Sequence, residues 1–398
     1  MTTVSTSVCD FKALLLGYYF AERLSESGQG DGDLPVFLKW EQLAAYARWD
    51  INDDKSFRGT ERTGNNLQAG GKVRLGADQA CQILSNQKTY GLWGLYTVPA
   101  RSSGLIAGNP TRLTEPARHL VESVYIPMLS NDGIRSVHAI ARLLAQRHID
   151  LYVAGRDRPL IKSVAKVLRR RLLKPELEVF RKHLLLGGPE DNDRTHGGQA
   201  VLTAALKTTF HEQEWWLTPA RVLHLAKVCR GYGDEGHLVA DRLERIRTCE
   251  FLLAPSVFLY GLLLGSDGQT LSEVAGDARR QWGGVVRTIN VDQAESLETE
   301  LKEALGDDDA GSRWLRIARA LADGKYEEVL RLLIDQNRYV MKARNGAAPW
   351  VELRVGKLHV LYRDDRESSL PEGKDLPNLW IHSYFLDSLR SIALELRD

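Results

Sequence analysis

The stretch from Gln82 to Val121 contains three segments of different character: Gln82-Ile-Leu-Ser-Asn-Gln-Lys-Thr-Tyr-Gly-Leu-Trp-Gly-Leu-Tyr96, Arg101-Ser-Ser-Gly-Leu-Ile106 and Asn109-Pro-Thr-Arg-Leu-Thr-Glu-Pro-Ala-Arg-His-Leu-Val121. The first segment predicts a helix, a turn and a second helix. Leu105-Ile106 and Arg112-Leu113 predict two short strands, and Asn109-Pro110 supplies the tight turn between them. Thr114 predicts the N-terminal cap of a further helix, because Pro116 follows it at the helix start.

This order of elements, helix, helix, strand, strand and helix, resembles that of winged-helix domains. In a winged helix, one helix carries side chains into the major groove of DNA and a β-ribbon lies beside it on the phosphate backbone. We therefore expect Lys88, Tyr90 and Arg101 to be presented by the helical part and Arg112 by the ribbon. These four residues are the first candidate nucleic-acid contacts.

Three residues count against a winged helix. Gly91, Gly94 and Pro99 lie inside the expected recognition helix, and an interior proline costs about 3 kcal/mol unless the helix ends there. The alternative is an ordinary helical domain in which the apolar residues between 92 and 96 are simply part of the core.

The bulk composition is that of a soluble globular protein. The chain has 398 residues, of which 43% are hydrophobic and 26% are charged, and this length predicts two or three domains rather than one. The 53 basic and 52 acidic residues leave a net charge of +1. Any affinity for a polyanion must therefore come from local clusters of lysine and arginine and not from the overall charge.

Cysteine usage and hydropathy predict a cytoplasmic protein that does not cross a membrane. Cys9, Cys81, Cys229 and Cys249 are far apart and form no C-x-x-C pair, which argues against a disulfide framework and against a structural zinc site. The N-terminus lacks the basic and apolar regions of a signal peptide. The longest apolar run, from Phe251 to Leu264, is too short to span a bilayer.

The fold class expected from these patterns is mainly α, with small β-ribbons, in a multi-domain protein. Polar, glycine-rich stretches at 187–198 and 306–311 are the best candidate boundaries. The expected regions are a winged-helix-like domain at 1–130, a basic helical segment at 131–190, a helical domain at 199–305 and a C-terminal region at 312–398. The C-terminal region is expected to carry a helical hairpin, a β-hairpin and a closing helix.

Apolar residues at helical spacing, together with capping signals, predict most of the other helices. Thr218-Pro219 is the clearest signal, an N-cap residue followed by proline at the first helical position. The stretch 50–76 is polar and glycine-rich, and predicts a long connection or a pair of irregular strands. The expected helices run from Phe11 to Ser25, Val36 to Trp49, Ile134 to Arg147, Pro159 to Leu186 with a break at Pro175, Pro219 to Arg230, Gly236 to Leu253, Val257 to Leu264, Leu271 to Trp282, Gln293 to Leu305 and Trp380 to Arg397.

The C-terminal region carries two further signals. The segment from Trp314 to Leu333 resembles one tetratricopeptide helix pair, but no second copy follows at that period, so a single helical hairpin is expected. Two strand-like runs, from Val351 to Val355 and from Leu358 to Tyr362, flank Gly356-Lys357. This pattern predicts a β-hairpin with a two-residue turn and glycine at the first central position.

A second group of candidate nucleic-acid contacts lies on a basic helix face. Lys162, Lys166, Arg169 and Arg170 recur at helical spacing, while apolar residues from Ile161 to Leu172 fall on another face. A stripe of cations of this kind attracts a phosphate backbone. The alternative is a solvated helix face whose charges are balanced by acidic residues elsewhere.

The sequence contains no P-loop, dinucleotide-binding or nucleophile-elbow motif and no histidines at zinc-protease spacing. We therefore expect no catalytic residue, no metal and no cofactor. The nearest approach to a metal-dependent nuclease is Glu352-x-Arg354 with Asp335 upstream. Arginine is a poor replacement for the lysine of such sites, whose compact ammonium lies beside the attacking water.

The sequence therefore predicts a non-catalytic DNA-binding or accessory subunit of a bacterial multi-protein complex that acts on DNA. The expected partners are double-stranded DNA and other proteins of that complex. Two alternatives stay open. One is a protein-interaction scaffold without nucleic-acid binding, and the other is a cryptic metal-dependent nuclease.

Overall fold

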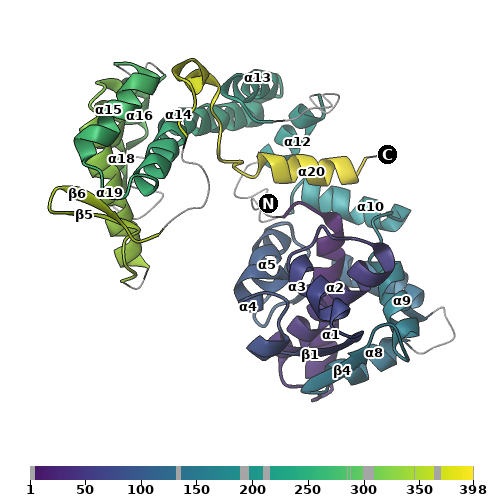
Figure 1. Ribbon diagram of the computed structural model, residues 1–398. Helices are drawn as coiled ribbons and strands as arrows, with labels where there is room; N and C mark the ends of the chain where they lie inside the picture. The colour runs from purple at the N-terminus through teal and green to yellow at the C-terminus, as the bar shows by residue number, and fades with distance from the viewer. Residues whose placement is uncertain are drawn as a thin grey trace. The chain divides into compact units, whose positions relative to one another are not determined.

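The computed structural model describes residues 5–130, 136–188, 197–208, 216–284, 286, 288–298, 309–344, 346–362 and 369–397 (Figure 1). Over these residues the chain is mainly helical, and its named strands form three two-stranded antiparallel sheets. The expected fold class, mainly α with small β-ribbons, is thus confirmed. The chain divides into two units: unit 1 comprises Met1–His211 and Ser383–Asp398, and unit 2 comprises Glu212–His382.

Unit 1 is built around two long helices that pack on each other, α1 (Val8–Glu26) and α2 (Asp33–Asn52). The other elements of unit 1 are α3 (Thr60–Gln68), β1 (Lys72–Gly76), η1 (Gln79–Cys81), α4 (Gln87–Tyr90), α5 (Leu92–Ser102), β2 (Ile106–Ala107), β3 (Arg112–Leu113), α6 (Glu115–Leu120), η2 (Val121–Tyr125), α7 (Ile126–Ser130), α8 (Ser136–Leu144), β4 (His148–Tyr152), α9 (Arg158–Val167), α10 (Lys174–Phe180), η3 (Arg181–Leu185), α12 (Gly198–Thr208) and α20 (Leu386–Glu395). In Figure 1, α4 and α5 lie on one side of the central helices and α9 lies on the other.

Helix α1 is buried on almost every face, because apolar residues occupy most of its positions. Ser7 caps it by accepting a hydrogen bond from the backbone N–H of Cys9 at 3.3 Å. The indole N–H of Trp40 on α2 donates to the backbone carbonyl of Ala13 on α1 at 2.7 Å. Gly17 permits this close approach, since a Cβ atom there would lie 2.6 Å from the ring of Phe37.

The stretch 50–76 is more ordered than its composition predicts. It contains α3 and β1, and β1 pairs antiparallel with β4, with Lys72 opposite Tyr152. The expectation of an irregular connection is therefore wrong. Helix α3 has little apolar periodicity of its own, and Gly64 lies against the ring of Trp49, where a Cβ atom would be 2.6 Å from it. Tertiary packing, rather than local propensity, accounts for this helix.

The elements of unit 2 are α13 (Pro219–Arg230), α14 (Gly233–Leu264), α15 (Leu271–Trp282), α16 (Val291–Ser296), α18 (Ala310–Ala322), α19 (Tyr326–Ala343), β5 (Val351–Arg354), β6 (Lys357–Val360) and η4 (Gly373–Asn378). Helix α13 packs along α14, and α18 packs on α19 as the expected helical hairpin. The core of unit 2 forms between α14, α15, α19 and the β-hairpin, with residues that include Leu259, Leu263, Val274, Leu330, Val351 and Leu358.

Two helices of unit 2 have the bounds that the sequence predicted, and both begin at a side-chain cap. The Thr218 hydroxyl accepts from the backbone N–H of Arg221 at 3.2 Å at the start of α13. Thr270 and Glu273 form a reciprocal capping box at the start of α15. A cap is local in sequence, which is why these boundaries could be predicted.

Helix α14 continues through Pro255, so the predicted break between Leu253 and Val257 is wrong. An interior proline costs about 3 kcal/mol. The residues on both sides of it, including Leu252 and Leu259, are buried in the core of unit 2, and this burial offsets the lost helical hydrogen bond.

Length and composition alone would allow α14 to cross a membrane. It has 32 residues, and an 18-residue window of it has a mean hydropathy of 1.4, with 39% of that window buried inside the structure. A core helix of a soluble protein passes the same test, so α14 is evidence neither for nor against a membrane span.

Three further expectations need correction. The closing helix begins at Leu386 and not at Trp380. The turn of the β-hairpin is centred on Val355 and Gly356 and not on Gly356-Lys357, because Arg354 pairs with Lys357. The helix expected from Gln293 to Leu305 is α16, which ends at Ser296. Residues 299–305 of that expected helix lie outside the described residues, and so do residues 189–196 of the expected domain boundary.

The contact at Gly17 generates a test of the packing of α1 on α2. We expect Gly17→Ala to destabilise unit 1 by about 1 to 3 kcal/mol, because the new methyl group overlaps the buried Phe37 ring. The matched control is Gly276→Ala on α15, where the nearest atom to the new Cβ is the flexible end of Arg280 at 3.5 Å. That variant should instead gain up to about 1 kcal/mol from helix propensity. Urea denaturation measures the change in unfolding free energy for both variants. A change of the same sign in the two variants would contradict the close contact between Gly17 and Phe37.

Candidate functional site

Two of the predicted contacts, Arg101 and Arg112, are engaged inside unit 1. The guanidinium of Arg101 donates to the backbone carbonyl of Gly108 at 3.0 Å and to the Thr111 hydroxyl at 2.6 Å. Arg112 forms an ion pair with Asp33 of α2 at 2.8 Å. Both arginines therefore fix the β2–β3 ribbon and attach it to the helices.

The ribbon itself is short. Ile106 lies opposite Leu113 and Ala107 opposite Arg112, and no further pairs form between β2 and β3. The hydroxyl of Thr114 does not cap α6 as we expected. It donates to the backbone carbonyl of Gly104 at 2.7 Å instead. The order α4, α5, β2, β3, α6 is the predicted one.

Lys88 and Tyr90 lie on the single-turn helix α4 and are exposed, Tyr90 to 51%. Asn86 caps this turn by accepting from the backbone N–H of Thr89 at 3.1 Å. The structure therefore presents these two side chains to solvent. It does not place them beside the second predicted group, because α4 and α9 lie on opposite sides of the central helices (Figure 1).

The second predicted group is only partly on a helix. Lys162 and Lys166 lie on α9, but α9 ends at Val167, and Arg169 and Arg170 follow it in a loop. The expected helix from Ile161 to Leu172 is therefore wrong in its second half. Leu168 is fully buried, and this burial anchors the chain just where the helix ends.

Buried side chains of α1 hold the backbone of this loop. The Cys9 thiol donates to the carbonyl of Leu168 at 2.8 Å, and the Lys12 ammonium donates to the carbonyl of Arg169 at 3.1 Å. The same ammonium forms an ion pair with Glu176 of α10 at 2.8 Å, and both side chains are almost fully buried. The loop is thus tied from inside the protein, and its arginine side chains point outward into solvent.

Asp54 joins the loop to a second segment. Its carboxylate accepts from Arg170 at 3.2 Å, and the Ser56 hydroxyl accepts from the same guanidinium at 2.7 Å. Segment 53–58 contributes the exposed cations Lys55 and Arg58. We call the exposed cations of segment 53–58 and of the loop, together with exposed Lys162 on the preceding helix α9, the basic surface of unit 1. It consists of Lys55, Arg58, Lys162, Arg169, Arg170 and Arg171.

Most cations of the basic surface have no acidic partner. Within the described part of the chain, no ion pair involves Arg58, Lys162, Arg169 or Arg171, while Lys55 pairs with Asp53 and Arg170 with Asp54. Sequence patterns did not connect Lys55 and Arg58 with this set. No helical or strand period relates them to Arg169, since the two segments meet only in the folded protein.

Beneath this surface lies a buried ionic network centred on Arg48 of α2. Its guanidinium donates to Asp10 of α1 at 2.5 Å and to Asp54 at 2.8 Å. The Tyr96 hydroxyl of α5 donates to the other oxygen of Asp10 at 2.6 Å. Burial alone raises the pKa of Asp54, but the charge of Arg48 and the hydrogen bonds from Ser56 outweigh burial and lower the pKa to about 2.

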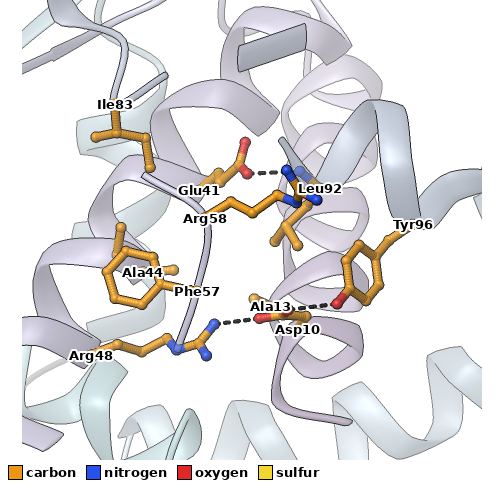
Figure 2. A pocket seen from close by; sticks show the side chains of 11 residues that line it. Asp10, Ala13, Glu41, Ala44, Arg48, Phe57, Arg58, Ile83, Leu92 and Tyr96 are labelled. Atoms are coloured by element: carbon orange, nitrogen blue, oxygen red, sulfur yellow. Dashed lines mark hydrogen bonds and ion pairs between the residues drawn. The ribbon is translucent and has the colours of Figure 1, made fainter. Parts of the chain in front are cut away.

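A cavity of about 20 Å³ adjoins this network (Figure 2). Glu41 and Arg58 lie on one side of it, and Asp10 and Arg48 lie on the other. Its remaining wall is mainly apolar, with Ala13, Ala44, Ala45, Phe57, Ile83 and Leu92. A space of this volume holds about one water molecule, so it is too small for a nucleotide or a coenzyme.

Glu41 is the unusual titratable group of this cavity. Its carboxylate accepts from the backbone N–H of Leu92 at 2.7 Å and from the Gln87 amide at 2.8 Å. Burial nevertheless dominates and raises the pKa of Glu41 to about 7. This carboxyl therefore links α2 to the start of α5 and is sensitive to pH near neutrality.

The residues of the nuclease alternative are paired with each other or with close neighbours. Glu352 and Arg354 form an ion pair at 3.0 Å, and Asp335 on α19 pairs with Arg338 at 2.7 Å. Among the described residues, no group of three or more histidine, cysteine or acidic side chains could hold a metal ion.

Comparison with known proteins gives no assignment: no protein-family model, no curated protein and no solved structure matches this chain.

The raised pKa of Glu41 generates a test. The folded state holds this proton more tightly than the unfolded chain, whose pKa is the ordinary value of 4.5, so stability is lost as the pH rises from there through about 7. We expect Glu41→Gln to reduce the difference in unfolding free energy between about pH 5 and pH 8 by up to about 3 kcal/mol. Urea denaturation at the two pH values measures this difference. Glu115→Gln, at an exposed position, is the control, and a pH dependence unchanged by Glu41→Gln would show that Glu41 does not titrate in this range.

Proposed function

We propose that this chain binds double-stranded DNA through the basic surface of unit 1 and acts as a non-catalytic accessory subunit of a larger assembly. The observation that carries this proposal is the loop 168–171, in which three consecutive arginines face solvent while Cys9 and Lys12 hold its backbone from inside. Contacts to phosphates need cations at fixed positions, and a loop anchored in this way supplies them with little loss of backbone entropy on binding.

The charge balance supports the same proposal. Lys162, Arg169 and Arg171 lie without ion-pair partners in the described structure, so an incoming phosphate would not have to displace an internal carboxylate. Phosphate contacts of this kind release counterions and give affinity without sequence preference. The basic surface therefore fits binding to the DNA backbone better than reading of bases.

We keep two of the four contacts predicted from the winged-helix order of elements. The elements from α4 to α6 follow the winged order, but Arg101 and Arg112 are occupied in holding the ribbon. Lys88 and Tyr90 are exposed, and we assign them a separate, weaker contact. Lys88→Gln tests this contact in the DNA-binding assay described below.

The alternative is a protein-interaction scaffold, and a groove in unit 2 favours it. This groove between α14 and α19 has a volume of about 270 Å³ and is lined mainly by apolar side chains, among them Val257, Tyr260, Val340 and Trp350. Val257 is 43% exposed. A concave apolar surface of this kind suits a side chain from a partner protein.

DNA binding at graded salt concentrations tests the proposal. We expect Arg169→Gln/Arg171→Gln to weaken binding of a labelled DNA duplex and to reduce the slope of log affinity against log salt by about 1.8, because two phosphate contacts are lost. Fluorescence anisotropy between about 50 and 200 mM salt measures both quantities.

A charge-matched control uses α19. Arg331→Gln/Arg338→Gln removes the same charge from exposed arginines that pair with Glu327 and Asp335, and should leave the salt slope unchanged. If the wild-type chain does not bind the duplex even at the lowest salt, the scaffold alternative replaces the proposal. Equal effects of the two double variants would show that net charge, and not the basic surface, controls binding.

A further inference from the structure

The β5–β6 hairpin of unit 2 has a strained residue at its tip. Arg354 pairs with Lys357, so the two central residues of the turn are Val355 and Gly356. Their φ angles are 51° and 76°, and two positive φ angles are what a type I′ turn requires. Asparagine and glycine adopt this left-handed conformation readily, whereas a β-branched residue such as valine is a true outlier there.

In the part of the chain that the structure describes, packing does not compensate for this strain. The side chain of Val355 is fully exposed, with a relative accessibility of 103%. An apolar side chain at such a position gains no burial energy and adds nothing to the core of unit 2. Backbone strain without compensating packing is found mainly at binding and active sites.

The two cations beside Val355 are a second unfavourable feature. Arg354 and Lys357 are directly opposite each other across the strands, and like charges in this arrangement destabilise a hairpin. Arg354 is partly neutralised by Glu352 at 3.0 Å. In the described structure Lys357 forms no ion pair, and its charge acts only at longer range on Glu273, whose pKa it helps to lower. A polyanion placed against the tip would relieve this repulsion.

The base of the hairpin is rigid. Val351, Leu358 and Val360 are buried in the core of unit 2. The backbone of Leu358 exchanges hydrogen bonds with the α14–α15 connection, accepting from Gly268 at 2.9 Å and donating to Gln269 at 2.8 Å. The tip is therefore held at a fixed position relative to α14 and α15, with an apolar residue between two cations.

We propose that the β5–β6 hairpin is a second DNA contact, in which Val355 lies against the sugars of the minor groove while Arg354 and Lys357 meet phosphates on its two walls. The minor groove is about 6 Å wide and has phosphates along both edges, which matches one small apolar side chain flanked by cations. Proteins that bind this groove combine basic and apolar side chains in the same way. The inference rests on the proposed function, since it assigns a second surface for the same ligand.

The decisive variant is Val355→Asn. Asparagine tolerates the left-handed conformation, so we expect the variant to be more stable, with Tm raised by about 2 to 4 °C. We expect its affinity for a labelled DNA duplex to be about tenfold lower, as for the loss of one buried valine contact. Because the variant is expected to be more stable, weaker DNA binding could not be attributed to misfolding.

Charge variants complete the test. Lys357→Gln should reduce the salt slope of DNA binding by about 0.9, whereas Lys325→Gln, at an exposed lysine of unit 2 that pairs with Asp323, should not change it. One outcome separates the two proposals: the wild-type chain binds DNA, Arg169→Gln/Arg171→Gln weakens that binding, and Val355→Asn binds as tightly as the wild type. In that case the hairpin inference is wrong and the proposed function stands. If the wild type does not bind DNA, both are wrong. A Val355→Asn variant less stable than the wild type would refute the strain on which the inference depends.

Discussion

The guanidinium of Arg48 lies between two buried carboxylates, and much of unit 1 is arranged around that contact. It binds Asp10 of α1 and Asp54 of the segment after α2, so one side chain connects two helices and a loop. Removing one of the two charges of a buried ion pair costs several kcal/mol, because the other charge stays desolvated and unpaired. Tyr96 adds a hydrogen bond from α5 to the same Asp10. The position of each of these elements therefore depends on the others.

The same network positions exposed arginines of the loop 168–171. Asp54 binds Arg48 on its inner side and Arg170 on its outer side, and its low pKa keeps it charged throughout the physiological range. Lys12 serves in a similar way, because it pairs with buried Glu176 and holds the Arg169 carbonyl. Buried charges thus position the exposed ones, and the loop needs no helical structure to present its arginines in a fixed arrangement.

Unit 2 shows how unfavourable local features point to function. Pro255 inside α14 is also locally unfavourable, but the buried residues around it account for it. Val355 has no such compensation within the described structure, and the cations beside it are only partly neutralised, Arg354 by Glu352. Natural sequences are mostly consistent between local preference and global structure. The hairpin tip departs from this rule without an internal benefit, and this departure is the basis on which we propose an external ligand for it.

Local chemistry allowed the sequence alone to predict the mainly α fold, the bounds of α13 and α15, the order of elements from α4 to α6 and the single α18–α19 hairpin. Caps, helical periods and turn residues act within a few positions, so a linear pattern records them. The end of α9, the presence of α3 and the membership of the basic surface were decided only by tertiary structure. Arg170 and Asp54 are 116 positions apart. No sequence period connects residues so distant, because their contact exists only after burial of α1 and α2 has brought the two segments together.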